Sequence, residues 1–497
     1  MAMSNYVLRA KEVCKTFSGV YALNKVNIDI RQGEVHCLAG ENGCGKSTLI
    51  NIISGVYTRD SGEIELNGKK YKKITPAEAI EEGVQVIYQD FAVFPNLTVK
   101  ENLSISTMVS SHKKIMNWKE SEKIAQKAME MIGVELDMEQ EVGEISVADK
   151  QLVAICRALI NDAKLLIMDE PTTALTKREV KTLFQTVLRL KRQGLSILFV
   201  SHKLDEVFEI CDRYTILRNG ENVLTGSTEK LDNRSFAYYM TGRRFLDVKF
   251  TAPKKGKEPL LEVKHLTAEG AFSDVSFTLY PGEILSVVGL LGSGRTELAL
   301  ALFGIQPASS GEIMIKGRKA CISKVTDAVG LGIGYVPEDR LTEGLFMKQS
   351  IGDNLVISKI EKLAGRLGIL NRKKMEAEKT DIMKRMKIKS PSPDYAVSTL
   401  SGGNQQRVVL GKWIARNMDV LILNGPTVGV DIGSKYDIHQ VMKELADEGM
   451  GILMISDDLP EVLAVSNRGI VIKNGRIAGS FETDGTTTEM LDEMIGV

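Results

Sequence analysis

The chain has 497 residues, 43% of them hydrophobic and 26% charged, a composition that predicts two or more folded domains and argues against a disordered chain. Its 64 basic and 64 acidic residues balance, so no net charge favours nucleic acid or an anionic membrane surface. No apolar run approaches the roughly 20 residues that span a bilayer, and the polar N-terminus is unlike a signal peptide, so we expect a chain that stays in the cytoplasm.

The first half alternates short apolar runs with longer helical patterns. The runs VHCLAG, LLIMDE and ILFVSH are typical of strands in a mainly parallel sheet, and the helical patterns between them complete an α/β fold. Residues 94 to 160 differ, because they are charged and rich in helix formers, as in WKESEKIAQKAMEMIG. They predict a helical subdomain beside the sheet.

A glycine-rich segment follows VHCLAG and leads into a helical pattern. It fits the phosphate-binding pattern GxxxxGK[ST], in which glycines let backbone N–H groups turn toward phosphate oxygens at a helix N-terminus. Lys46 is the predicted contact to the β and γ phosphates, and the Ser47 hydroxyl is a predicted Mg²⁺ ligand. A chance match to this pattern occurs in about one chain in thirty of this length. The candidate nucleotide-binding residues are Gly40, Glu41, Asn42, Gly43, Cys44, Gly45, Lys46, Ser47 and Thr48.

Cys44 stands at a variable position of this segment. A helix N-terminus lowers the pKa of a nearby thiol, so a redox switch is one interpretation. The simpler interpretation is a small, tolerated residue whose reactivity has no role.

Two later strands deliver polar side chains to the edge of the sheet at which α/β folds bind ligands. LLIM runs into Asp169 and Glu170, and ILFVS runs into His202. Asp169 suits the magnesium shell, and Glu170 suits a general base that orients water. A neutral His202 imidazole suits the γ-phosphate or the attacking water, although a histidine taken alone would more often be a solvated loop residue.

The second half repeats the first. GEVHCLAGENGCGKSTL near residue 33 returns as GEILSVVGLLGSGRTEL near residue 282, and KLLIMDEPTTALT is matched by DVLILNGPTVGVD. A repeat of domain length indicates a fused pair of domains and not a solenoid. We predict an N-terminal domain at 1–245, an exposed linker at 246–258 and a C-terminal domain at 259–497.

These residues resemble the ATP-binding cassette (ABC) family over nearly the whole chain. GENGCGKST is similar to Walker A, LLIMDEP to Walker B, Gln89 in VIYQD to the Q-loop, His202 to the switch histidine and LSGGNQQ at 400–406 to the signature. The fused arrangement, with NQQ after LSGG and PEDR at 337–340, resembles the ATPases of ribose, galactose and arabinose importers. The resemblance implies two tandem P-loop NTPase domains, α/β in class, each with a mainly parallel sheet, a helical subdomain and an antiparallel β subdomain.

The resemblance also implies two composite nucleotide sites, formed head to tail between the cassettes as an internal pseudo-dimer. The first site joins the N-terminal Walker residues to the C-terminal signature and adds Gln89 as a catalytic residue and magnesium ligand. Phe17 is the implied adenine-stacking aromatic, and its alternative role is packing at a strand edge. The signature residues of this site are Ser401, Gly402 and Gly403.

The second implied site is degenerate. Arg295 replaces the Walker A lysine and Gly425 replaces the catalytic glutamate, so we expect no hydrolysis there. The sequence leaves open whether this half still binds nucleotide or only serves as a scaffold. The other replacements are Val147 and Ala148 in the signature, Glu338 in the Q-loop, Asn424 at the magnesium position and Asp457 at the histidine position.

The resemblance implies an enzyme that hydrolyses ATP with Mg²⁺ to drive an ABC importer for a small solute, with a monosaccharide as the first expectation. Its implied partners are two membrane permease subunits, received by an apolar surface near 89–97, and an extracytoplasmic solute-binding protein. Its implied location is the cytoplasmic face of the cell membrane, as a peripheral subunit.

Two other functions remain as alternatives. One is a soluble twin-cassette ATPase that acts on ribosomes or nucleic acid. The short linker, the zero net charge and the degenerate site argue against it, so we expect no nucleic-acid partner. The other is a non-enzymatic nucleotide sensor, which would require an idle Glu170.

Overall fold

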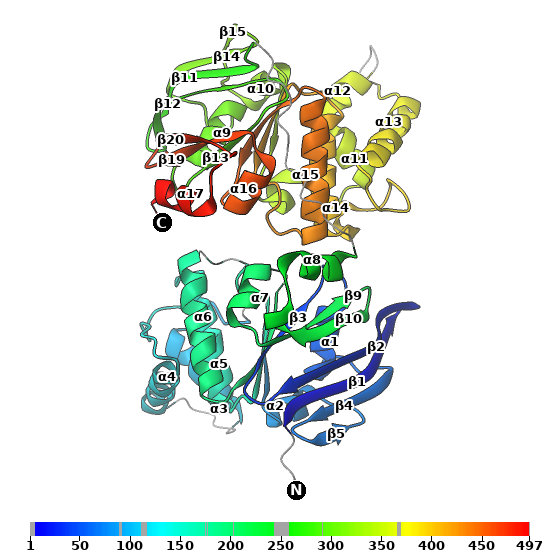
Figure 1. The fold of residues 1–497 in the computed structure, drawn as a ribbon, viewed down its shortest axis with the longest axis vertical. Helices are drawn as coiled ribbons and strands as arrows, with labels where there is room; N and C mark the ends of the chain where they lie inside the picture. Colours follow the sequence, from blue (N-terminus) through cyan, green and yellow to red (C-terminus); the bar gives the residue numbers. More distant parts are fainter. Residues whose placement is uncertain are drawn as a thin grey trace. The chain divides into compact units, whose positions relative to one another are not determined.

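In a computed structural model of the chain, the structure is described for residues 5–88, 92–110, 117–173, 175, 177–201, 203–242, 258–290, 292–364 and 369–496. The chain divides into two compact units, Met1–Phe245 and Leu246–Val497 (Figure 1). The linker predicted at 246–258 lies outside the described residues, except for Glu258.

A six-stranded sheet forms the centre of the first unit. Its strands are β3 (Val35–Ala39), β6 (Val84–Ile87), β7 (Leu165–Asp169), β8 (Ser196–Val200), β9 (Arg213–Arg218) and β10 (Glu221–Ser227). They lie in the order β10-β9-β3-β8-β7-β6, and every neighbouring pair from β9 to β6 is parallel. Strands β3, β7 and β8 are apolar and buried almost throughout, as expected when both faces of a parallel sheet are covered. Parallel pairing therefore brings the carboxyl ends of these strands to one edge.

A four-stranded antiparallel sheet completes the β structure of this unit. It contains β1 (Tyr6–Phe17), β2 (Val20–Arg31), β4 (Ser61–Leu66) and β5 (Lys69–Tyr71) in the order β2-β1-β4-β5. Strands β1 and β2 form a hairpin that begins at the pair of Phe17 and Val20. The predicted antiparallel β subdomain is this sheet.

Helices cover the central sheet and form the predicted helical subdomain. The three helices α3, α4 and α5 contact one another, and Figure 1 shows α3 and α4 on the side of the unit away from the antiparallel sheet. Among the residues described, no helix is both long enough and apolar enough to cross a bilayer. The helices are α1 (Lys46–Ile53), α2 (Pro76–Glu81), α3 (Val99–Ser110), α4 (Trp118–Ile132), α5 (Val147–Ile160), α6 (Lys177–Arg192), α7 (Leu204–Ile210) and α8 (Asn233–Thr241), with a 3-10 turn at Thr228–Lys230.

The second unit repeats this architecture. Its antiparallel sheet contains β11 (Leu261–Ala268), β12 (Phe272–Leu279), β14 (Ser310–Ile315) and β15 (Arg318–Ala320) in the order β12-β11-β14-β15. Its central sheet contains β13 (Ile284–Val288), β16 (Ile333–Val336), β17 (Val420–Asn424), β18 (Gly451–Ile455), β19 (Arg468–Lys473) and β20 (Arg476–Glu482) in the order β16-β17-β18-β13-β19-β20. The two α/β units confirm the predicted fold class.

The helices of the second unit follow the same plan as those of the first. They are α9 (Arg295–Phe303), α10 (Val325–Gly330), α11 (Ile351–Val356), α12 (Ile360–Leu363), α13 (Arg372–Arg385), α14 (Gly402–Ile414), α15 (Ile432–Asp447), α16 (Leu459–Val465) and α17 (Thr488–Ile495). Shorter turns are the π-helical turn Arg340–Gly344 and the 3-10 turns Ile357–Lys359 and Val397–Thr399. Figure 1 shows α11 and α13 on the side of the unit away from its antiparallel sheet.

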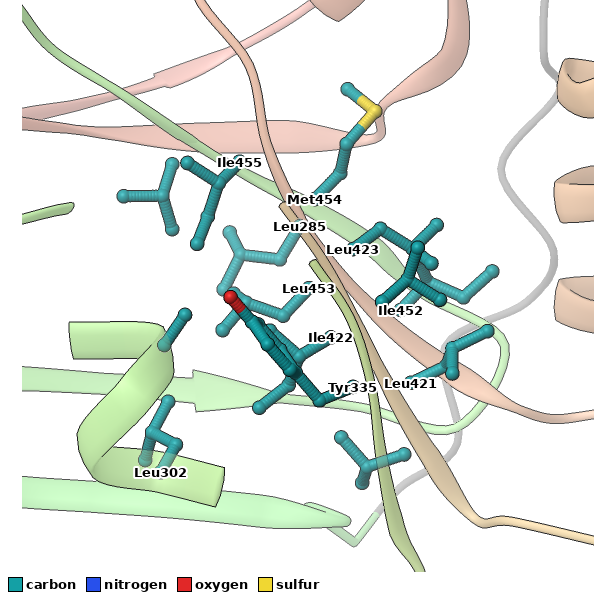
Figure 2. Packing of buried hydrophobic residues seen from close by; sticks show 14 of the residues in the cluster. Leu285, Leu302, Tyr335, Leu421, Ile422, Leu423, Ile452, Leu453, Met454 and Ile455 are labelled. Atoms are coloured by element: carbon teal, nitrogen blue, oxygen red, sulfur yellow. The ribbon is translucent and has the colours of Figure 1, made fainter. Parts of the chain in front are cut away.

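The core of the second unit lies along β17 and β18. Figure 2 shows Leu421, Leu423 and Leu453 from these strands packed with Tyr335 from β16 and Leu302 from α9. Leu453 is fully buried in this cluster. Burial of a leucine side chain contributes roughly 1.5–3 kcal/mol, and a cavity left in a packed core adds to the loss when that side chain is removed.

Leu453→Ala should therefore lower the free energy of unfolding of the second unit by about 2–5 kcal/mol. The chain contains two tryptophans, Trp118 and Trp413, so in a Trp118→Phe background the fluorescence of Trp413 follows the second unit in a denaturant titration. Leu341, which is 46% exposed, supplies the control, and Leu341→Ala should change stability by less than about 0.5 kcal/mol. Equal losses in the two variants would contradict the assigned core.

Candidate functional site

The phosphate-binding segment forms a tight loop between β3 and α1. Gly45 adopts φ 106°, a left-handed conformation that favours glycine, and a Cβ at this position would lie 2.5 Å from the Ala22 carbonyl oxygen. A Cβ at Gly40 would overlap the Leu217 carbonyl oxygen. The loop is thus packed against β2 and β9 so closely that these two positions have no room for a side chain.

Lys46 is folded back over this loop. Its Nζ atom donates hydrogen bonds to the carbonyl oxygens of Gly40, at 2.7 Å, and Glu41, at 3.1 Å. The side chain is buried, so the positive charge is fixed at the mouth of the loop beside the first turn of α1. The first backbone N–H groups of a helix have no intrahelical acceptor, and the helix dipole favours negative charge there. Loop, lysine and helix N-terminus together fit the phosphate groups of a nucleotide.

The exposure of the other loop residues differs from one to the next. Asn42, Gly43 and Ser47 are exposed, whereas Cys44 is buried beneath the loop. Burial raises the pKa of the Cys44 thiol, and the charge of Lys46 opposes this only in part. The redox-switch interpretation of Cys44 predicted a lowered pKa, so it is wrong in that respect; desolvation outweighs the helix N-terminus.

Asp169 and Glu170 lie at the end of β7, beside β8 at the common sheet edge. Asp169 is paired with Val200 in the parallel ladder, and the N–H of Glu170 donates to the Val200 carbonyl oxygen at 3.1 Å. Burial raises the pKa of Asp169, as does the neighbouring Glu170 carboxylate, while the charge of Lys46 lowers it. A carboxylate whose charge is opposed by burial and by a neighbouring carboxylate fits a divalent cation, which would neutralise it.

Glu170 has an unusual backbone conformation. Its φ is 47°, in the left-handed region where a residue with a side chain is strained by about 1–3 kcal/mol. Such strain persists only when surrounding contacts hold the backbone in place. The equivalent Gly425 of the second unit has φ 58°, which glycine adopts without that cost.

Glu206, which lies in α7 behind this edge, is a candidate site residue that the sequence motifs do not reveal. Its buried carboxylate accepts hydrogen bonds from the Thr172 hydroxyl, at 2.5 Å, and the Ser201 hydroxyl, at 2.5 Å. The internal repeat carried the signal that was overlooked. Where the second half changes its Walker B glutamate, it keeps a threonine, a serine and a glutamate at the matching positions, Thr427, Ser456 and Glu461.

For three predicted site residues, Gln89, His202 and Phe17, the structure gives less information. Gln89 and His202 lie outside the described residues, although β6 ends at Ile87 and β8 ends at Val200, on the common edge. Phe17 is 43% exposed and contacts Tyr57 edge to face, with ring centroids 5.5 Å apart. An exposed ring on the hairpin that adjoins the loop suits contact with a planar base, and adenine stacking by Phe17 stays a prediction.

The matching edge of the second unit lacks the paired carboxylates. Asn424 and Gly425 stand in place of Asp169 and Glu170, and Asn424 is buried. Arg295 begins α9, and its Nη2 atom lies 3.5 Å from an Asp457 carboxylate oxygen. Arg295 keeps a positive charge at this edge that suits a phosphate group. Asn424 and Gly425, at the end of β17, provide no carboxylate that could accept a proton from water.

The signature segment of the second unit is a helix start that requires glycine. Ser401 precedes α14, and its hydroxyl accepts a hydrogen bond from the Asn404 side chain at 3.0 Å. A Cβ at Gly403 would overlap the Ser434 side chain, and one at Gly402 would lie 2.9 Å from Arg340 Nη2. In the first unit Ser146 caps α5, and Val147 and Ala148 carry side chains where these glycines stand.

Comparison with known proteins identifies the same two segments. The family described as "ABC transporter" matches residues 23–173 and 272–428, more than half of the chain. A "Ribose import ATP-binding protein RbsA" of Bacillus licheniformis is 41% identical over 488 residues, covering 97% of this chain and 98% of that protein. A "Putative ribose/galactose/methyl galactoside import ATP-binding protein 1" of Agrobacterium fabrum is 40% identical over 496 residues, covering 98% and 97%.

A similarity in fold extends to a solved structure. A model of ribosome-bound archaeal Pelota and ABCE1 matches with a TM-score of 0.64 at 17% identity, covering 97% of this chain and 80% of that one. At this identity the match shows the fold alone.

Because Cys44 is buried and its thiol pKa is raised, alkylation of the native chain by iodoacetamide at pH 7 should be much slower at Cys44 than at Cys321. Cys321 is an exposed free cysteine of the second unit and serves as the internal control. Peptide mass spectrometry over a time course measures both rates. Labelling of Cys44 as fast as Cys321 would contradict the buried position.

Proposed function

The chain belongs to the ABC transporter family, and we propose that it is the ATP-hydrolysing subunit of an importer for a small sugar, with one catalytic site. The observation that carries the proposal is the asymmetry between the two sheet edges. One edge combines the Lys46 loop with Asp169 and Glu170, and the other has Asn424 and Gly425 instead. The import function is drawn from the relatives, which align over nearly their full length and are named as sugar import proteins.

The first unit supplies the groups that phosphoryl transfer requires. The loop amides of residues 40–48 and Lys46 bind the phosphates of ATP, and Phe17 stacks on the adenine. Ser47, Asp169 and Gln89 would hold Mg²⁺, which neutralises charge on the β and γ phosphates when bound. These ligand assignments are supported by the exposure of Ser47 and by the burial of Asp169 beside the Glu170 carboxylate, which together raise the pKa of Asp169.

Hydrolysis uses a water molecule that Glu170 orients. The water oxygen forms a bond to the γ-phosphorus, the bond from that phosphorus to the β–γ bridging oxygen breaks, and Glu170 accepts the proton released by the water. His202 contacts the γ-phosphate or the attacking water. ADP and phosphate are the products, and positioning of these groups supplies most of the catalysis.

The second unit contributes to this reaction without hydrolysing ATP itself. We propose that Ser401, Gly402 and Gly403 bind the γ-phosphate held by the first unit, through backbone N–H groups at the start of α14. Ser401 makes no side-chain capping hydrogen bond at the start of α14, and the first N–H groups of a helix have no intrahelical acceptor, which supports a role in binding an anion. With Gly425 in place of a general base, turnover at the second unit's own Walker segment should be negligible.

The proposed partners are two membrane permease subunits and an extracytoplasmic solute-binding protein, and the chain works as a peripheral subunit on the cytoplasmic face of the membrane. The described part of the predicted docking segment, residues 92–97, includes Phe94, which is 47% exposed and suits an apolar contact. The fold match to a ribosome-bound protein has only 17% identity and therefore does not indicate a shared function. Action on ribosomes or nucleic acid is the weaker alternative.

Glu170→Gln should lower the ATPase rate of the purified chain by about 10²–10⁴-fold, because an amide cannot accept the proton, while ATP binding is retained. Arg295→Ala in the second unit should reduce the rate by less than about tenfold, since no base acts there. Steady-state phosphate release and equilibrium binding of a fluorescent ATP analogue measure the two properties. Equal loss of hydrolysis in the two variants would contradict the single-site proposal.

A further inference from the structure

We propose that Glu206 is a positioning residue for hydrolysis. Its carboxylate ties the turn that carries Glu170 to the start of the loop that follows β8. The inference rests on the proposed function, because it assigns a role in the reaction of the first unit. Glu206 lies in α7 and is not part of the phosphate-binding segment at residues 40–48.

Both oxygens of the Glu206 carboxylate are engaged. Oε1 accepts the Thr172 hydroxyl at 2.5 Å and lies 3.2 Å from Lys203 Nζ, and Oε2 accepts the Ser201 hydroxyl at 2.5 Å. The side chain is 6% exposed, and a buried carboxylate is stable only with such partners. Lys203 Nζ also lies 3.3 Å from the Thr172 hydroxyl, and the Lys203 N–H donates to the Ser201 hydroxyl at 3.0 Å. The side chains of Glu206, Lys203, Thr172 and Ser201 thus form one connected network of hydrogen bonds and an ion pair.

This network holds the residues on either side of the strained turn at Glu170. Thr172 follows Glu170 by two residues, and Ser201 follows Val200, whose carbonyl oxygen accepts the Glu170 N–H at 3.1 Å. The Glu206 carboxylate therefore links the two segments in addition to that backbone hydrogen bond and to the contact of Lys203 with Thr172. A left-handed residue with a side chain relaxes unless its neighbours hold it. Without the link we expect the Glu170 carboxylate to leave its catalytic position, and small misplacements of a reacting group cost about a hundredfold in rate.

The second unit contains the same link without the catalytic residue. Glu461 accepts hydrogen bonds from the hydroxyls of Thr427, at 2.7 Å, and Ser456, at 2.9 Å. His439 Nε2 lies 2.6 Å from its Oε1 atom. The turn that it holds begins at Gly425, which is unstrained at φ 58° and carries no base. Glu461 is therefore a matched control for any purely structural effect of Glu206.

The test compares Glu206→Gln with Glu461→Gln in the full chain. Glutamine keeps the volume but replaces one acceptor oxygen with an N–H₂ group that cannot accept a hydroxyl hydrogen bond. We expect Glu206→Gln to lower kcat by about ten- to a hundredfold with KM and the dissociation constant of ATP changed by less than about threefold, because the phosphate-binding loop is untouched. Glu461→Gln should change kcat by less than about threefold while shifting Tm by a similar amount.

Smaller changes at Thr172 test the same link if a glutamine variant fails to fold. Thr172→Val removes the hydroxyl and keeps the shape, so it should lower kcat in the same way, and Thr172→Ser should restore it. A wild-type kcat in Glu206→Gln, or equal loss of kcat in Glu206→Gln and Glu461→Gln, would overturn the positioning role. Wild-type hydrolysis that is indifferent to Glu170→Gln would overturn the proposed function itself, whereas hydrolysis that needs Glu170 but not Glu206 would overturn only this inference.

Discussion

Parallel pairing of β3, β8 and β7 is the constraint on which the site of the first unit depends. Because the three strands run in the same direction, the segments that follow their carboxyl ends share one edge of the sheet. That edge receives the loop of Lys46, the carboxylates of Asp169 and Glu170, and Ser201. These groups come from three separate stretches of sequence, and the order of strands alone makes them neighbours.

The two units share one fold but differ in the side chains that the reaction requires. Both have the same pair of sheets, the same glycine-lined loop and the same carboxylate holding a threonine and a serine. They differ at a few side chains on one edge, of which the exchange of Glu170 for Gly425 matters most. The first unit retains a strained backbone at Glu170, and the second adopts the same backbone with glycine. A fold that persists while its reactive groups change shows that activity resides in the site and not in the architecture.

Much of this arrangement is predictable from the sequence because its signals are local. The glycine pattern around Lys46, the apolar strands and the helix formers of residues 94 to 160 each depend on neighbours along the chain. The roles that were missed depend on contacts across the fold. Thr172 and Glu206 are 34 residues apart, and only the packing of α7 behind the sheet edge brings them together.

The state of Cys44 was not predictable for a similar reason. A helix N-terminus is visible in the sequence and lowers a thiol pKa, but the packing of the loop against β2 and β9 is not visible. Burial decides the direction of the shift, so the pKa of the thiol is raised. Phe17 is an intermediate case, since its position on a hairpin beside the loop is described while its contact with a base stays a prediction.

Hydrolysis only of the ATP held by the Walker residues of the first unit can be measured by vanadate trapping of a photoreactive nucleotide. The chain would be incubated with 8-azido-ATP, magnesium and vanadate, irradiated, digested and mapped by mass spectrometry, with Glu170→Gln as the control for trapping that requires hydrolysis. We expect trapped label on peptides of residues 1–245, near Phe17, that is lost in Glu170→Gln. Equal hydrolysis-dependent labelling of residues 259–497 would contradict it.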